Sequence, residues 1–397
     1  MRCSNSLCLL ALLIGPGCFR AAKLPGPELS ELSPVALDPK DVLGAGAAEL
    51  DASVRLRSLG LLVRYVKDEG GGAWAPRALY DPNPAVQSEG VRALLSRTRE
   101  PRSIALLQAL AAHPGTDPYV RGHAAFELAL MGDNSALASL QQTLAEPHRP
   151  YEQAPLALAA ARMGDSAALA PLIAALQAGE FPLEIPFFLD CGRSGLTELV
   201  APLTEASQHV EEELVLPIAA ALLLLGDSKG EALFRDALGS KNIELRLEAV
   251  DYLSESTAEI APELLQRARN AGPAAVRDWA TLALVSRGLE RPELALDAMA
   301  SPDRELRQQG AWALSRAIEI EGKSQKAKDL RHDMTRGLYD PDTPVVIESA
   351  RGFAAVGQPE DCPALSGLLV DQPLGVQIEA AGAMLAIERR TGRCTTP

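Results

Sequence analysis

Apolar residues recur along most of this chain with the period of an amphipathic α-helix. Residues 116–133, TDPYVRGHAAFELALMGD, place Val120, Ala124 and Leu128 on one helical face, because four residues separate each from the next. The same order of polar, apolar and small positions returns in three later segments, residues 301–317, 340–357 and 371–388. This recurrence predicts an internal repeat rather than a single irregular core.

The repeat can be aligned on the residue equivalent to Val120. Successive copies lie about 31 residues apart, and one spacing, between Leu306 and Val345, is 39. The eleven aligned residues are Val54, Val86, Val120, Glu152, Leu183, Leu214, Leu245, Val276, Leu306, Val345 and Val376. A regular spacing over eleven copies predicts a stack of similar units, because a single unit cannot bury its own apolar face.

Two columns of the alignment indicate how the units pack. Eight residues after each aligned position the residue is always apolar, as in Leu62, Leu128 and Leu284. Four residues after it the residue is mostly small, as in Ala124 and Gly310, which lets a neighbouring helix approach closely. A second helical pattern precedes each aligned helix, as at 135–146, 166–179, 229–240 and 291–301. Each copy is therefore expected to be a helical hairpin.

The pattern D-P-x-V-R-x-x-A-A-x-x-L-x-x-x-G-D resembles the HEAT-repeat family, in the short form of the phycobilisome-lyase-type repeats. It covers about residues 48–390. The resemblance implies an all-α, right-handed α-solenoid of about eleven hairpins over residues 48–397, with the second helices lining a concave face. Eleven hairpins stacked at about 10 Å each predict an arc on the order of 100 Å long.

The resemblance also implies a ladder of Asp and Arg side chains between repeats. The family's Arg follows the aligned position, and its Asp lies one helical turn earlier. The residues that match this ladder are Asp51, Arg55, Asp117, Arg121, Arg246, Arg277, Asp303 and Arg307. Other copies have Gln, Glu or Val in the Arg position, so the ladder is incomplete.

Two features depart from the repeat. Pro155, Pro186 and Pro217 occupy one column, three residues after the aligned position. Proline inside a helix costs about 3 kcal/mol, so we expect those second helices to start late, with proline in the first turn. The 39-residue spacing predicts a longer helix or a protruding loop around residues 317–330.

The first residues differ from the rest. Arg2 precedes an apolar run too short to span a bilayer, which is typical of a signal peptide over residues 1–17. Gly17-Cys18 resembles the lipobox of bacterial lipoproteins, which implies a lipid on Cys18; ordinary cleavage near Gly17 is the alternative. Residues 18–47 are rich in Pro, Gly and Ala, as in a tether. We expect an exported cell-envelope protein, anchored in the bacterial outer membrane and facing the periplasm.

Composition and charge narrow the class of function. Of 397 residues, 47% are hydrophobic but only 4% are aromatic, which is typical of many small cores of Leu and Ala. The formal net charge of −14 argues against nucleic acid as a partner. No motif for a nucleotide, a cofactor or a metal ion occurs, so we expect no cofactor and no catalytic site.

The cysteines and acidic runs each have a structural and a functional interpretation. Cys191 falls in the apolar column, so we expect it to be a buried core residue. The alternative is a reactive or bilin-binding thiol. Cys362 and Cys394 lie at adjacent ends of the last hairpin, where a disulfide could form in an oxidising compartment. Glu211–Glu213 form either a solvated first helical turn or a cation-recruiting cluster.

The most favoured function is a non-catalytic scaffold that holds a protein partner on the concave face. Positions three, seven and ten residues after the aligned position point away from the apolar face, and they include Arg57, Glu89, Glu348 and Glu379. The candidate contact residues are His123, Glu248, Tyr252, Trp279, Gln309 and Arg316. Trp279 is either an exposed interface anchor or a residue packed against a neighbouring repeat. The alternatives are a structural envelope-assembly component and a lyase-type enzyme acting on a protein.

Overall fold

The computed structural model describes residues 38–68, 71–97, 100–146, 148–179 and 185–394. The signal peptide, Cys18 and most of the expected tether lie outside these residues. Within them the chain forms eleven consecutive helical hairpins and no strand. The all-α solenoid expected from the sequence is confirmed.

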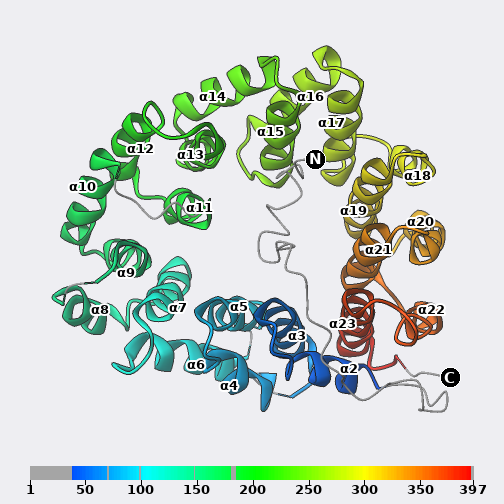
Figure 1. The fold of residues 1–397 in the computed structure, drawn as a ribbon, viewed down its shortest axis with the longest axis horizontal. Coiled ribbons are helices and arrows are strands. Elements are labelled where there is room, and N and C mark those ends of the chain that lie inside the picture. Colours follow the sequence, from blue (N-terminus) through cyan, green and yellow to red (C-terminus); the bar gives the residue numbers. More distant parts are fainter. Residues whose placement is uncertain (1–37, 69–70, 98–99, 147, 180–184, 395–397) are drawn as a thin grey trace.

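The helices form two layers, which Figure 1 shows as an outer and an inner ring. The first helix of each hairpin lies in the outer layer. The outer helices are α2 (Pro39–Gly46), α4 (Trp74–Leu79), α6 (Pro101–Ala112), α8 (Leu137–Leu144), α10 (Ala170–Ala178), α12 (Val200–Ala206), α14 (Ser228–Gly239), α16 (Ala261–Ala271), α18 (Glu293–Met299), α20 (Gln325–Met334) and α22 (Cys362–Ser366). Short 3₁₀ turns adjoin four of them, η4 (Ser166–Leu169), η5 (Thr197–Leu199), η6 (Thr335–Tyr339) and η7 (Pro359–Asp361).

The second helix of each hairpin lies in the inner layer. The inner helices are α3 (Ala52–Tyr65), α5 (Pro84–Leu95), α7 (Pro118–Leu130), α9 (Pro150–Arg162), α11 (Ile185–Ser194), α13 (Glu212–Leu224), α15 (Ile243–Glu255), α17 (Ala274–Ser286), α19 (Arg304–Glu321), α21 (Thr343–Val356) and α23 (Leu374–Thr391). The apolar column eight residues after the aligned position supplies the core between the layers. Leu62, Leu128, Cys191, Leu284 and Phe353, five members of that column, are all fully buried.

Polar residues set the starts and ends of the helices. Asp117 accepts a hydrogen bond from the backbone N–H of Tyr119 at 2.9 Å, and Asp303 accepts one from Glu305 at 2.8 Å. These bonds satisfy backbone groups that have no partner inside the helix. Gly132 takes a positive φ of 82° after α7, which residues with a Cβ adopt at a cost.

The stack closes on itself, so the molecule is a ring rather than an open arc (Figure 1). The last inner helix, α23, packs against α2 and α3 of the first hairpin. The approach is close at Gly382, where a Cβ atom would lie 2.7 Å from Cδ1 of Leu61. The expected open arc is therefore wrong. The sequence fixes the unit, but the small rotation between units accumulates over eleven hairpins and brings the two ends together.

Three local expectations can now be compared with the structure. The solenoid starts at Pro39, inside the segment 18–47 expected as a tether, because Asp38 accepts a hydrogen bond from Lys40 and starts α2. Pro186 lies in the first turn of α11, as expected. Pro155 and Pro217 do not, because α9 and α13 begin five residues earlier and continue through them.

The long spacing between the ninth and tenth copies has the form of a longer helix. Helix α19 runs for 18 residues and ends at Gly322, whose φ is 64°. Ser324 then starts α20 by accepting a hydrogen bond from Ala327. Over the described part of the chain, no helix combines the length and the apolar character that crossing a bilayer requires.

Candidate functional site

The inner wall, the surface formed by the inner helices α3 to α23, carries the residues that the sequence singled out as partner contacts. His123 lies on α7, Gln309 and Arg316 lie on α19, and Glu248 lies on α15. His123, Glu248 and Gln309 are half-buried, and Arg316 is exposed.

Two of the candidate contacts are not accessible. Tyr252 and Trp279 are only 6% and 7% exposed and belong to one apolar cluster between α13 and α17. The interpretation of Trp279 as an exposed anchor is therefore wrong, and its packing against neighbouring repeats is confirmed. The physical reason is that both side chains pack into an apolar cluster shared by neighbouring hairpins.

Ion pairs bind the last inner helix to the first. Glu379 of α23 accepts two hydrogen bonds from Arg57 of α3, at 2.7 and 2.6 Å, and one from Arg351 of α21, at 3.1 Å. Burial alone would raise the pKa of the Glu379 carboxyl, but the two guanidinium groups hold it below its usual range. Arg389 adds a bond to the carbonyl of Val66 at 2.9 Å. The wall is thus charge-paired at the place where the ring closes.

The pairing continues on α5. Glu89 occupies the position in its repeat that Glu379 occupies in the last one, and it is also bound by two arginines. Arg64 of α3 lies 3.2 Å from its Oε1 and Arg92 lies 3.3 Å from its Oε2. A buried carboxylate between two arginines is therefore used twice on the wall, once inside the stack and once at its closure.

A third charged cluster spans α7 and α11. Arg193 of α11 donates hydrogen bonds to both carboxylate oxygens of Glu127 on α7, at 2.8 and 2.9 Å, and another to Asp190 at 2.9 Å. The helix between them, α9, presents Pro155 and Ala159 at the equivalent positions. These small side chains leave room for Arg193 to reach across α9.

This cluster includes His123, whose Nδ1 lies 3.8 Å from Oδ2 of Asp190. Burial, together with the charges of Arg92 and Arg193, lowers the pKa of His123 to about 3. The imidazole is therefore neutral at physiological pH, and the ring of Tyr119 packs edge-on against it with centroids 4.4 Å apart. His123 is therefore a packed, neutral member of the wall.

Cys191 lies beside this cluster but is not reactive. It is fully buried in the apolar column, and burial together with the charge of Asp190 raises its pKa well above the usual value. A thiol in such a site remains protonated and does not act as a nucleophile. Over the residues described, no group of three or more His, Cys, Asp or Glu side chains is placed to hold a metal ion.

Helix α15 differs from the rest of the wall, because two of its three carboxylates, those of Glu248 and Asp251, have no arginine beside them among the described side chains; the third, Glu255, lies 4.0 Å from Arg316. We call Glu248, Asp251 and Glu255 the acidic section. Burial raises the pKa of Glu248 to about 7, with a further contribution from the charges of Glu212 and Glu213 on α13. Burial and the charges of its two neighbours in the acidic section raise the pKa of Asp251 well above its usual range. Among the described side chains, none forms an ion pair with Glu248 or Asp251.

The hydroxyl group of Tyr252 lies next to these carboxylates. Burial raises the pKa of Tyr252, with a further contribution from the charges of Glu248 and Asp251. Its Oη is buried and has no hydrogen-bond partner among the described residues. An unpaired buried hydroxyl costs about 1–3 kcal/mol, so this hydroxyl destabilises the packing around α15.

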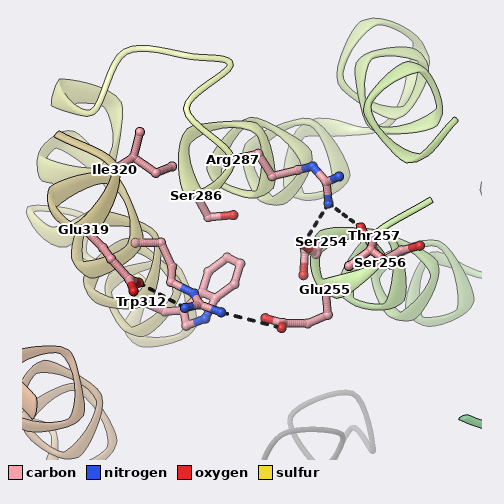
Figure 2. Close-up of a pocket in the computed structure, with 10 residues that line it drawn as sticks. Ser254, Glu255, Ser256, Thr257, Ser286, Arg287, Trp312, Glu319 and Ile320 are labelled. Carbon is pink, nitrogen blue, oxygen red and sulfur yellow. Dashed lines mark hydrogen bonds and ion pairs between the residues drawn. The ribbon is translucent and has the colours of Figure 1, made fainter. Parts of the chain in front are cut away.

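A pocket adjoins the acidic section where α15, α17 and α19 end. It has a volume of about 270 Å³ and is lined by Glu255, Trp312, Ile320 and polar residues of the α15 end. Figure 2 shows Glu255 and Trp312 on opposite sides of this pocket. Ile320 is 57% exposed because the extended α19 carries it beyond the end of α17. We call this cavity the α15–α19 pocket.

One wall of the pocket is fixed by an arginine that the sequence did not single out. Arg287 follows α17 and donates hydrogen bonds to the carbonyls of Leu253, Ser254 and Ser256, at 3.2, 3.2 and 2.7 Å (Figure 2). These carbonyls lie at the end of α15, where no helical N–H remains to bond them. Arg97, at the equivalent position of the second repeat, binds the end of α3 in the same way.

The Asp and Arg residues of the expected ladder lie at the turns, but they do not pair as the resemblance implied. Asp51, Asp117 and Asp303 accept hydrogen bonds from backbone N–H groups at their own helix starts. Their arginines reach elsewhere. Arg55 binds Asp81 of the next hairpin at 2.9 and 3.0 Å, and Arg307 binds Asp340 at 2.8 and 3.1 Å.

The remaining ladder arginines contact backbone carbonyls of the preceding turn. Arg121 binds the carbonyl of His113 at 2.7 Å, Arg246 binds that of Ser240, and Arg277 binds that of Gly272 at 3.3 Å. The Asp partners in the next hairpin were not found from the sequence because they lie outside the aligned columns. The ladder residues therefore hold the turns and do not face a partner.

Cys362 and Cys394 form a disulfide that joins the start of α22 to the segment after α23, with Cα atoms 5.7 Å apart. This is the pairing that the sequence suggested for the last hairpin. It fastens the outer helix to the inner helix that closes the ring.

No protein-family model and no curated protein matches the chain. Among solved structures, the chain is similar to an engineered protein with 17% identity and a TM-score of 0.26, over 89% of this chain and 99% of that one. It is also similar to human deoxyhypusine hydroxylase in complex with glycerol, with 18% identity and a TM-score of 0.27, over 88% of this chain and 96% of that one. Similarities at this level say nothing about function.

Proposed function

We propose that this chain is a non-catalytic scaffold that holds a protein partner against the inner wall of its helical ring. The observation that carries the proposal is the contrast between two parts of that wall. From α21 through the closure to α11, the buried carboxylates are bound by arginines. On α15, Glu248 and Asp251 are half-buried and lack such partners.

Unneutralised carboxylates weaken the folded state, because each repels the others and loses contact with water. A partner that places positive groups beside them removes this penalty, and the gain appears as binding free energy. Repeat rings suit this role since their stacked inner helices form one extended surface. The acidic section therefore supports a binding surface more than a structural one.

The role is proposed as non-catalytic and free of cofactors. The described thiol, Cys191, is buried and protonated, and the carboxylates around His123 are already bound by Arg193. The overall negative charge makes nucleic acid an unfavourable partner. These features support a protein as the partner.

Site-specific crosslinking in living cells tests the proposal. A photo-crosslinking residue at Gln309 lies on the inner wall, and one at Gln266 lies on the exposed face of the outer helix α16. Both positions replace a glutamine, so the two variants are matched. Capture of a discrete protein from position 309 and not from 266 supports the scaffold. Self-crosslinks alone, or no product from either site, would favour the structural envelope component and contradict the proposal.

We also propose export and lipid attachment at Cys18, with the ring on the periplasmic side of the outer membrane. The Cys362–Cys394 disulfide supports an oxidising compartment, because such bonds persist outside the cytosol. Expression of Cys18→Ala in a bacterial host tests the anchor. The wild-type chain should fractionate with membranes, and the variant should be released into the periplasm; equal membrane association of both would contradict lipid attachment.

A further inference from the structure

We infer that the partner presents a positively charged, extended segment of its chain to the acidic section, with an apolar side chain in the α15–α19 pocket. This inference rests on the proposed scaffold function and specifies what the inner wall binds. It combines two observations, which are the spacing of the carboxylates along α15 and the composition of the adjoining pocket.

The carboxylates form a stripe along one side of α15. Glu248, Asp251 and Glu255 are separated by three and four residues, so they lie on the same helical face and span about 10 Å. An extended peptide advances about 3.3 Å per residue, so basic side chains two or three residues apart fit this stripe. The stripe matches the reach of two or three lysines or arginines.

The α15–α19 pocket lies next to the carboxylate stripe and would bind a different kind of side chain. Glu255 belongs to both, so a segment that follows the carboxylates enters the pocket at that residue. Trp312 and Ile320 line the pocket, and Arg316 lies 4.0 Å from Glu255 and 3.1 Å from Glu319. Those two carboxylates share Arg316, and Arg287 also lines the pocket, so its two negative and two positive groups balance. The apolar residues of the pocket therefore favour an uncharged side chain.

Peptide binding to the full-length chain tests the inference. The probe is a short fluorescein-labelled peptide of alternating lysine and leucine, and fluorescence anisotropy reports its binding. The first control peptide has glutamate in place of lysine, and the second has serine in place of leucine. We expect the lysine–leucine peptide to bind most tightly, with an affinity that falls as salt rises, and the glutamate peptide not to bind.

A matched pair of triple variants locates the site. The site variant combines Glu248→Gln, Asp251→Asn and Glu255→Gln. The control variant makes the same change of net charge with Glu198→Gln, Asp236→Asn and Glu259→Gln, all exposed residues of the outer layer. We expect the site variant to bind the peptide about tenfold more weakly and the control variant to bind within about twofold of wild type. Equal affinity of the two triple variants would overturn the inference.

Spermine serves as a competitor; displacement of the peptide at equal concentration would identify a small polyamine rather than a protein segment and overturn the inference.

The outcomes separate this inference from the proposed function. If crosslinking at Gln309 captures a protein equally well in the site triple variant, the scaffold stands and the charged-segment inference is wrong. If position 309 captures nothing, the scaffold itself fails, whatever the peptide does.

Discussion

The substitution Glu379→Gln should open the ring where α23 meets α3. In the wild type, this buried carboxylate accepts bonds from Arg57 of the first hairpin and Arg351 of the tenth. Glutamine keeps the shape of the side chain but removes the charge, so two guanidinium groups are left against a neutral amide. The remaining closure contacts include the packing of α23 against α2, the Arg389 bonds, the Lys67–Glu388 pair and the packing around Gly382.

The size of the effect follows from burial. Removing one partner of a fully buried ion pair costs about 3–5 kcal/mol. The Glu379 side chain is 5% exposed, but Arg57 is 24% exposed and therefore partly solvated when it loses its partner. Solvent screening reduces the cost to about 2–3 kcal/mol. That change increases the population of the open ring on the order of 100-fold.

Hydrogen exchange with mass spectrometry measures this opening directly. Backbone amides of α2 and α23 should exchange faster by a similar factor in the variant, whereas amides of α15, on the far side of the ring, should not change. Small-angle X-ray scattering should show a larger radius of gyration. Acid should have the same effect on the wild type, because a carboxyl whose folded pKa is lowered loses its contribution to stability as the pH falls through that pKa.

Glu89→Gln is the matched control. Glu89 has the same position in its repeat and is also held by two arginines, but it lies inside the stack. Its substitution should destabilise the α3–α5 contact and leave α23 protected. The reasoning is refuted if Glu379→Gln leaves exchange in α2 and α23 unchanged, or if Glu89→Gln exposes α23 to the same extent.

Three further predictions concern stability. Burial and nearby carboxylates raise the pKa of Glu248 to about 7, so the wild type should lose stability as the pH rises from about 4.5 to 7. The melting temperature of Glu248→Gln should therefore equal that of the wild type at pH 4 and exceed it at pH 8. Cys394→Ser opens a loop of 32 residues and should cost about 3–4 kcal/mol, seen as faster hydrogen exchange in α22 and as a melting temperature that no longer responds to reductant. Gly122→Ala puts a Cβ 2.7 Å from the backbone N of Leu156 and should lower the free energy of unfolding by about 1–3 kcal/mol. Gly239→Ala meets nothing within 4 Å and should leave it unchanged. Chemical denaturation measures both.

The candidate site was predictable only in part. The position of Glu248 on the inner wall followed from its place three residues after an aligned residue. The burial of Trp279 was not predictable, because Trp279 packs in an apolar cluster whose members come from several hairpins. Arg287 was missed because its role lies in the carbonyls of another repeat, which no spacing within its own repeat reveals.

Proline illustrates how context overrides a local rule. Pro155 lies inside α9 although proline disfavours helix interiors. Its side chain lies where α7 presents Gly122, and a Cβ there would be 2.9 Å from Cβ of Pro155. Pro155 therefore packs closely against α7. The helical periodicity of the sequence cannot reveal such a contact, because the two residues belong to different hairpins.

The sequence by itself determined the repeating unit of this protein: the helical hairpin, its number of copies and the buried column at Leu62, Leu128 and Phe353. These features depend on residues a few positions apart, and local periodicity records them. Only the tertiary structure decided that the stack closes into a ring, that Glu379 joins its ends, and that Glu248 and Asp251 lack an arginine. Those outcomes depend on small rotations summed over eleven units, and on which side chains then meet across hundreds of residues.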